Sequence, residues 1–193
     1  MIHIERATAM SAYFLEKAGG RMNDIKLAKF QYLAERESLI TMLSPMVGDE
    51  ALSLYHGPCL SHTLNLTCDI AEDSSWDAHI GFEPYEIADE GSNMAVLTNP
   101  IRWEDFISPA DIEILDGLWT RFGHMDWRQF RDWCHQNVPE YTEVRYGTRR
   151  WITLEDIFKG AGDDPEMATA KANEVRYHER FESLYDGKIA VPV

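Results

Sequence analysis

Three residues between positions 56 and 62 have the types and spacing of possible metal ligands. His56, Cys59 and His62 follow one another at intervals of three. Imidazole and thiolate groups bind zinc and other soft transition metals, and Cys59 and His62 would lie on neighbouring turns of a helix. His56, however, precedes Gly57-Pro58, and zinc normally takes a fourth ligand or a water molecule. We therefore interpret the three as ordinary turn and helix residues and expect no metal; a metal-dependent hydrolase is the alternative.

The other candidates for catalysis are weaker. Cys134 and His135 are adjacent, and adjacent helical residues point about 100° apart, so they do not predict a catalytic dyad. We expect His135 to contact backbone or a carboxylate near a helix end, and His178 to be a core histidine. Neither a phosphate-binding glycine loop nor a nucleophile elbow is present in the sequence. The sequence therefore predicts a protein that is not an enzyme and needs no cofactor.

Three cations stand among apolar residues in one predicted helix. At about 100° per residue, Lys26, Lys29 and Arg36 share roughly 120° of arc with apolar side chains such as Phe30. A cation in that position must reach water along its aliphatic stem or pair with a carboxylate, for which Asp49 and the many surrounding acids are candidates. Two interpretations stay open. The cations line the rim of the core, or they mark the edge of a polar pocket or partner surface.

The stretch that follows combines an extended run with a Gly-Pro pair. Gly48-Asp49 indicates a turn, residues 51–55 alternate as in a strand, and Gly57-Pro58 is predicted to break the run before a helix that carries Ser61. A glycine and proline at a helix start would let another element approach closely and present the first N–H groups outward. The corner either supports a binding site or joins a strand to a helix without binding a ligand.

Start and stop signals predict the helices that position these residues. Capping residues at Asn23, Ser108, Asp126 and Thr153, and the pair Asp164-Pro165, each precede a helical apolar pattern. The expected helices cover about 5–18, 23–43, 108–122, 126–138, 153–160 and 164 onward, with a brief one after Pro58. In the last helix the expected apolar stripe is Met167, Ala170, His178, Phe181 and Tyr185.

Between residues 51 and 97 the apolar period changes to two. Ala78, Ile80 and Phe82, and then Met94 and Val96, predict short strands around a polar turn at residues 90–93. The predicted fold class is therefore mainly α (α+β), a compact helical domain of about six to seven helices with a small inserted β element.

Composition limits the classes of partner and the compartment. With 18 Lys+Arg against 33 Asp+Glu the formal charge is −15, which repels nucleic-acid phosphates and favours a basic protein partner. The three cysteines are odd in number, no signal peptide is evident, and no apolar run approaches the roughly 20 residues of a membrane span. The 193 residues are enough for one core. We expect a cytoplasmic protein with a single domain over residues 1–186 and a loosely ordered tail over 187–193.

Five motifs occur in a fixed order over nearly the whole chain. They are KLAKFQYLA at 26–34, the Gly48-Asp49 turn, Tyr-x-Gly-Pro at 55–58, the segment 135–140, and residues 152–157. Together they resemble the Panacea domain, also described as the SocA-like antitoxin family. The chain departs from the family pattern at Gln31, Glu35, Cys59 and Tyr141.

The resemblance implies a binding function. Panacea-domain proteins are typically antitoxins that neutralise small toxic proteins, often encoded beside them in bacterial or prophage operons. One branch acts as a proteolytic adaptor that delivers its client to an ATP-dependent protease. The alternative function is therefore a proteolytic adaptor or a phage-encoded regulator that delivers a client protein to such a protease. Family members often carry an added DNA-binding segment; the resemblance here begins near Met1, so we expect no operator binding.

We therefore expect the partner to be a cognate toxin that is basic and encoded by a neighbouring gene. Aromatic and arginine side chains carry much of the binding energy of interfaces. The candidate contact residues form three groups and two single positions. The groups are the helix edge of Lys26, Lys29, Tyr32 and Arg36, the corner of His56, Gly57, Pro58 and Ser61, and the aromatic residues Trp76 and Tyr141, which we expect to be exposed; the single positions are Asp49 and His135. Alternatively these residues hold the fold together and the partner surface lies elsewhere.

Overall fold

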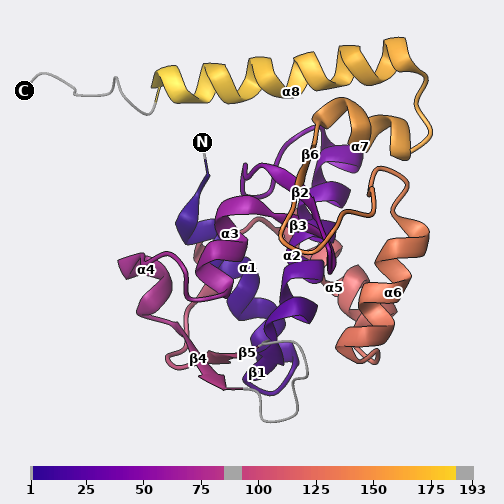
Figure 1. The fold of residues 1–193 in the computed structure, drawn as a ribbon. Coiled ribbons are helices and arrows are strands. Elements are labelled where there is room, and N and C mark those ends of the chain that lie inside the picture. The colour runs from indigo at the N-terminus through magenta and orange to yellow at the C-terminus, as the bar shows by residue number, and fades with distance from the viewer. Residues whose placement is uncertain (1, 85–92, 186–193) are drawn as a thin grey trace, which may run out of the picture.

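The protein is a bundle of helices around one central helix, α2, in a computed structural model that describes residues 2–84 and 93–185 (Figure 1). The α-helices are α1 (Ile4–Lys17), α2 (Asp24–Met42), α3 (Ser61–Thr67), α4 (Ser74–Asp77), α5 (Pro109–Phe122), α6 (Trp127–Asn137), α7 (Leu154–Gly160) and α8 (Pro165–Tyr185), with a 3₁₀ turn at Trp103–Asp105. The mainly helical fold class with a small β component is confirmed, with eight α-helices in the described residues.

The predicted helix starts are confirmed by their caps. The Asn23 side chain accepts a hydrogen bond from the backbone N–H of Lys26 (3.2 Å). Ser108, Asp126 and Thr153 each form a capping box with the residue three positions later. Such a cap satisfies N–H groups that have no partner inside the helix and is worth about 1 kcal/mol. The sequence therefore encodes these boundaries locally.

Helix α2 is buried on almost all sides because α1, α3, α5, α6 and the β2–β3 hairpin pack around it. Its Phe30 ring stacks on Phe14 of α1 (4.5 Å between ring centroids) and contacts Phe130 of α6 (4.8 Å). Besides Asp24 at its first position, four polar residues of α2, namely Lys29, Gln31, Glu35 and Ser38, are buried. A buried polar group needs a hydrogen-bond partner, so these four positions join α2 to its neighbours.

Two three-stranded antiparallel sheets flank the bundle. One has the order β1-β5-β4, from β1 (Arg21–Asn23), β5 (Asn93–Leu97) and β4 (Ile80–Pro84). The other has the order β3-β2-β6, from β3 (Gly57–Leu60), β2 (Ala51–Leu54) and β6 (Arg150–Ile152). Strands β2, β4 and β5 were predicted. Strands β1 and β6 were not, because three residues give no readable period, and β3 was not, because its first residues were assigned to the start of a helix. Most of the predicted turn at 90–93 lies outside the described residues.

The prediction that Gly57-Pro58 starts a helix is wrong. Gly57 pairs with Leu54 and begins strand β3, so Tyr55 and His56 form the two-residue turn of a hairpin. Pro58 is tolerated there because β3 is an edge strand, where a missing N–H breaks no ladder. Helix α3 begins three residues later.

The apolar stripe predicted for α8 is also wrong. The residues that pack into the core are Ala168, Ala172 and Val175, whereas Met167, Ala170, His178 and Phe181 are exposed. The side chain of Tyr185 lies outside the described residues. Helix α8 contacts α7 chiefly and extends past the body (Figure 1). Because these core-facing residues are small, α7 and α8 approach closely and share a narrow contact. We call the row Ala168, Ala172 and Val175 the seam of α8. The tail 187–193 lies outside the described residues, and the single domain stays a prediction.

Candidate functional site

Lys29 is the centre of the first group of motif residues. It is 2% exposed, and its Nζ donates a hydrogen bond to the Pro58 carbonyl oxygen (2.8 Å). Burial lowers the pKa of this ammonium, because the charged form loses hydration. Gly57 has φ of +102°, and a Cβ there would lie 3.1 Å from Lys29 Cε and 3.0 Å from His135 Cδ2. Gly57-Pro58 therefore lets the hairpin approach Lys29 and His135.

His135 and Tyr141 contact the hairpin from the side of α6. Their rings stack with centroids 4.7 Å apart, and the Tyr141 hydroxyl donates to the Leu54 carbonyl oxygen (3.2 Å). Burial, followed by the nearby charge of Lys29, lowers the pKa of His135. Both residues are partly buried, so the expectation of an exposed Tyr141 is wrong. Lys29, Gly57, Pro58, His135 and Tyr141 thus come together as one cluster joining α2, α6 and the β2–β3 hairpin.

A second cluster forms around a carboxylate that the sequence analysis did not single out. The buried Glu140 side chain accepts hydrogen bonds from the Tyr32 hydroxyl (2.7 Å) and from Arg36 Nε (2.5 Å). A Cβ at Gly160 would overlap Glu140 Oε2, so α7 approaches this pair closely. Glu140, at the end of the motif 135–140, is therefore the carboxylate that pairs with Arg36.

Asp49, proposed as the partner of the cations, has another role. Its carboxylate accepts hydrogen bonds from the backbone N–H groups of His62 (3.2 Å) and Thr63 (2.7 Å). Both belong to the first turn of α3, so Asp49 caps this helix from a distance in sequence. Ser61 is the first residue of α3, and its N–H donates to the Glu50 carbonyl oxygen (2.8 Å).

Lys26 stabilises the end of another helix. Its Nζ donates to the carbonyl oxygens of Gly123 (2.9 Å) and Met125 (2.6 Å), just beyond the C-terminus of α5. The negative end of a helix dipole favours a cation there. Trp76 is 0% exposed, so the expectation that it is an exposed aromatic is wrong. His56, in the hairpin turn, contacts the ring of the exposed Tyr55 (5.0 Å between ring centroids).

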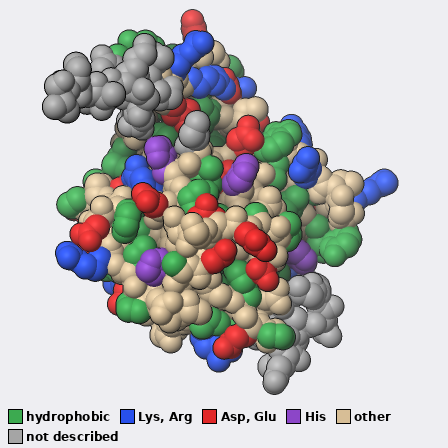
Figure 2. Space-filling model, turned by 90° about the vertical axis from the view of Figure 1, so that its left-hand side faces the viewer, with side chains coloured by type: hydrophobic (Ala, Val, Ile, Leu, Met, Phe, Trp, Pro, Cys, Tyr) green, Lys and Arg blue, Asp and Glu red, His purple; other side chains and the backbone are tan. Residues whose placement is uncertain are grey.

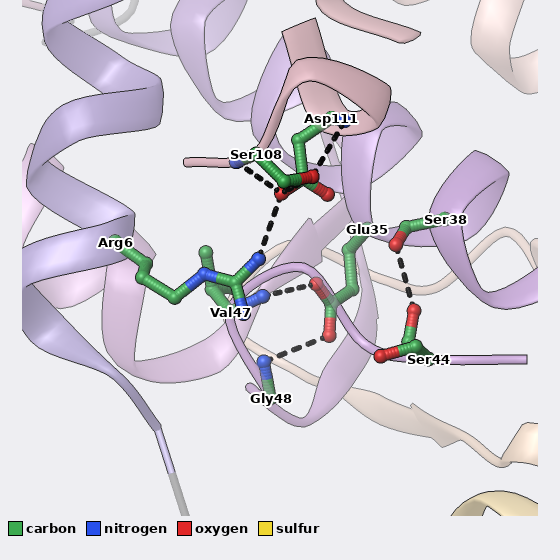
Figure 3. Close-up of polar contacts among 8 residues, drawn as sticks. All are labelled: Arg6, Glu35, Ser38, Ser44, Val47, Gly48, Ser108 and Asp111. Atoms are coloured by element: carbon green, nitrogen blue, oxygen red, sulfur yellow. Dashed lines mark hydrogen bonds and ion pairs between the residues drawn. The ribbon is translucent and has the colours of Figure 1, made fainter. Parts of the chain in front are cut away.

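A buried carboxylate positions the loop that carries Asp49 (Figure 3). Glu35 accepts hydrogen bonds from the backbone N–H groups of Val47 (2.7 Å) and Gly48 (3.0 Å). Burial raises its pKa to about 7, although these N–H donors act in the opposite direction. In the same view Arg6 pairs with Asp111 (2.9 Å) across α1 and α5. This region therefore links α1, α2 and α5 to the 43–50 loop.

Two cavities accompany the clusters. The larger, of about 510 Å³, is lined by Lys29, Cys59 and the hairpin turn together with residues 146–149. The smaller, of about 290 Å³, is lined by Tyr32, Arg36, Asp49 and parts of α7 and α8. Six of the predicted contact residues line one of these cavities: Lys29, His56 and Gly57 line the larger, and Tyr32, Arg36 and Asp49 line the smaller.

The cysteines have little nucleophilic character. Burial raises the pKa of Cys59 to about 11 and those of Cys68 and Cys134 to about 12. Each thiol is therefore protonated near neutral pH, and the thiolate is the reactive form. Within residues 2–84 and 93–185, no three His, Cys, Asp or Glu side chains form a group that could hold a metal ion.

An exposed aromatic and arginine surface lies beside the larger cavity, and the sequence analysis missed it. Tyr55, Tyr146 and Trp151 are 44%, 78% and 47% exposed. The Tyr55 and Tyr146 rings meet edge to face (5.7 Å), and the Arg149 guanidinium lies over the Trp151 ring (5.6 Å). The available signal was the segment RYGTRRW at 145–151, which places three arginines and two aromatic residues within seven positions.

Figure 2 shows one face of the molecule with side chains of every type. Acidic, basic, histidine and apolar side chains are interspersed there among backbone and other atoms. Scattered single apolar residues are normal for a protein surface. We name the residues Tyr55, Tyr146, Arg149 and Trp151 the aromatic surface and treat it as the best candidate for a partner contact.

The comparison with protein families decides the affiliation of the chain. The family model described as "Antitoxin SocA-like, Panacea domain" matches residues 27–139. The chain belongs to this family. The matched part of the Panacea domain begins in α2 and includes both cavity-lining strands β2 and β3, whereas α7 and α8 follow it. Comparisons with curated proteins and with solved structures gave no match. Among the described residues, no helix is long and apolar enough to cross a membrane.

Proposed function

We propose that this protein is a cytoplasmic antitoxin that neutralises a small toxic protein by binding it directly, without catalysis. The observation that carries the proposal is the Panacea domain over residues 27–139. Protonated cysteines and a formal charge of −15 are compatible with a protein that binds rather than reacts. We further propose that the toxin is basic and encoded by a neighbouring gene.

The aromatic surface is our candidate for the close contact. Tyrosine, tryptophan and arginine are the residue types most often found at energetic hot spots of interfaces. Tyr146 and Trp151 can be covered by a partner without unfolding the domain, because both are already exposed. By contrast, Lys26, Arg36 and Asp49 make hydrogen bonds within the chain that a partner would have to replace. The net charge then steers a basic toxin, and the aromatic surface supplies the contact.

The test begins with the neighbouring reading frame. Cells should express that frame alone and together with this chain, and the pair should then be co-purified. We expect the frame alone to stop growth, co-expression to restore it, and the two proteins to elute as one complex. A harmless neighbour, or a toxin that never associates with this chain, would contradict the proposal.

Binding through the aromatic surface is tested by paired variants. Tyr146→Ala and Trp151→Ala should each weaken the complex by about 2 kcal/mol, roughly thirtyfold, if they are hot spots. Ile70→Ala is the control, because Ile70 is an apolar residue about as exposed as Tyr146 (73% against 78%) and lines neither cavity. Equal affinity of all three variants would place the contact elsewhere while leaving the antitoxin function standing.

A further inference from the structure

The larger cavity has the dimensions and walls of a small-molecule site. Its volume of about 510 Å³ is within the usual range of about 300–1,000 Å³ for such sites. It opens between the first turns of α2, the β2–β3 hairpin and the loop 146–149. The apolar side chains that line it are Ile25, Ala28, Leu54 and Leu64. These walls favour a ligand with an apolar body.

Two cationic side chains line the cavity from different sides. Lys29 lines it from the protein interior, and Arg149 lines it from the exposed loop. An ammonium has three N–H donors, and among the described residues Pro58 O is the one acceptor that Lys29 contacts. The N-terminal turns of α2 add the positive end of a helix dipole. The cavity therefore favours a ligand with an anionic group.

One carboxylate also lines the cavity, but it is already engaged. Asp24 accepts hydrogen bonds from the backbone N–H groups of Ile25 (2.7 Å) and Asn93 (2.7 Å), which fix its oxygens at the start of α2. The bond from Asn93 joins the start of α2 to strand β5. Asp24 therefore offsets part of the positive charge without supplying a partner for Lys29 or Arg149.

We propose that this cavity binds a small organic acid whose apolar or aromatic body contacts Ile25, Leu54 and Leu64 and whose carboxylate pairs with Lys29 and Arg149. The proposal is independent of the antitoxin function. A bound acid lies beside Tyr55 and Tyr146, so its occupancy couples to any partner that binds the aromatic surface.

Three matched compounds test the chemistry. We would titrate the full chain with 3-phenylpropionate, 3-phenylpropanamide and 3-phenylpropylamine and follow the backbone amide resonances of residues 146–149 by NMR. We expect the acid to bind at least about tenfold more tightly than the amide, since a hydrogen bond to a charged group is worth about 1.5–3 kcal/mol. The amine should bind more weakly still. Equal binding of the three compounds, or no binding of the acid at millimolar concentration, would overturn the proposal.

Two arginine variants locate the contact. Arg149→Gln should weaken 3-phenylpropionate about fivefold to tenfold. Arg145→Gln should leave it unchanged, because Arg145 is exposed in the same loop but does not line the cavity. Equal effects of the two variants would show that the acid binds the surface only and would overturn the site. Lys29→Met should abolish binding if it keeps the melting temperature of the wild type; if it unfolds, the comparison of the arginine variants decides.

Discussion

Two Arg–Glu pairs of similar geometry differ in burial, and burial decides their effect on stability. Arg36 pairs with Glu140 in the interior, whereas Arg176 pairs with Glu155 (2.6 Å) at the surface between α8 and α7. Removing one partner of a buried pair leaves an uncompensated charge, which typically costs about 3–5 kcal/mol. An exposed pair is worth only about 0–1 kcal/mol.

We therefore predict that Glu140→Gln lowers the free energy of unfolding by about 3 kcal/mol and that Glu155→Gln lowers it by less than about 1 kcal/mol. Urea denaturation at neutral pH measures both. The Glu140 result also bears on function, because a fold-stabilising Glu140 explains its place in the motif 135–140 without a partner. Similar small effects of both substitutions would mean that the Arg36 pair does not support the fold.

Glu35 predicts a pH dependence of stability. Its pKa is raised to about 7 in the folded protein, against an ordinary value of 4.5. Between these values the folded state holds a proton that the unfolded state has released, so stability is greatest at the acid end and falls as the pH rises. The loss amounts to about 3 kcal/mol by about pH 8.

Glu35→Gln isolates this contribution, because glutamine does not titrate. The stability of the wild type relative to this variant should decline steadily from about pH 5 to about pH 8 in urea denaturation series. Other groups, such as His135 with its lowered pKa, contribute equally to both proteins and cancel in the difference. A difference that stays constant with pH would contradict a titrating Glu35.

At the scale of elements, the hairpin β2–β3 depends on the absence of a side chain at Gly57. Gly57→Ala combines backbone strain at φ of +102° with contacts of about 3 Å to Lys29 and His135. Gly147→Ala is the matched control, because φ is +78° there but a Cβ would meet nothing within 4 Å. We expect Gly57→Ala to cost at least about 2 kcal/mol and Gly147→Ala about 1 kcal/mol. Equal melting temperatures of the two variants would show that the close approach is unimportant.

Helix α8 is attached through a narrow seam, which makes its docking sensitive to one position. Ala172→Asp places a charge in the buried seam, whereas Ala170→Asp places the same charge on the exposed side. We expect only the first variant to release α8, detected as faster proteolysis after residue 163 with the remaining domain still folded. Equal protection of α8 in both variants would mean that other contacts hold it.

The sequence predicted those elements whose boundaries depend on local chemistry. Asn23, Ser108, Asp126 and Thr153 were recognised as caps because a capping side chain bonds within its own first turn. Strands β1 and β6 were missed because their pairing partners lie many residues away. The last helix was assigned the wrong face because a seam of alanines carries a weaker apolar signal than exposed Met167 and Phe181.

The candidate site was predictable in its parts but not in its arrangement. Lys29, Gly57 and His135 were singled out from the sequence, and the fold brings them together. Glu140 pairs with Arg36, and Asp49 caps α3. Both interactions are tertiary contacts, which the spacing of residues along the chain does not predict. The aromatic surface was missed because Tyr55 and Tyr146 meet only after the hairpin and the loop fold against each other.

At the scale of the whole molecule, charge and contact have separate effects on partner binding. A formal charge of −15 acts at a distance and is screened by salt, with a Debye length of about 10 Å at 0.1 M. The aromatic surface acts only on contact. The net charge should determine the rate of association, and the aromatic surface should determine the rate of dissociation.

For the proposed complex with a toxin, we predict that the association rate constant falls about tenfold or more between low and high salt, whereas the dissociation rate constant changes little. Stopped-flow fluorescence measures both. Neutralising the exposed acids Glu5, Glu72 and Glu113 to glutamine should slow association without affecting dissociation, and Trp151→Ala should do the reverse. An association rate that is independent of salt would show that the toxin is not basic, and the contact surface would then have to account for recognition alone.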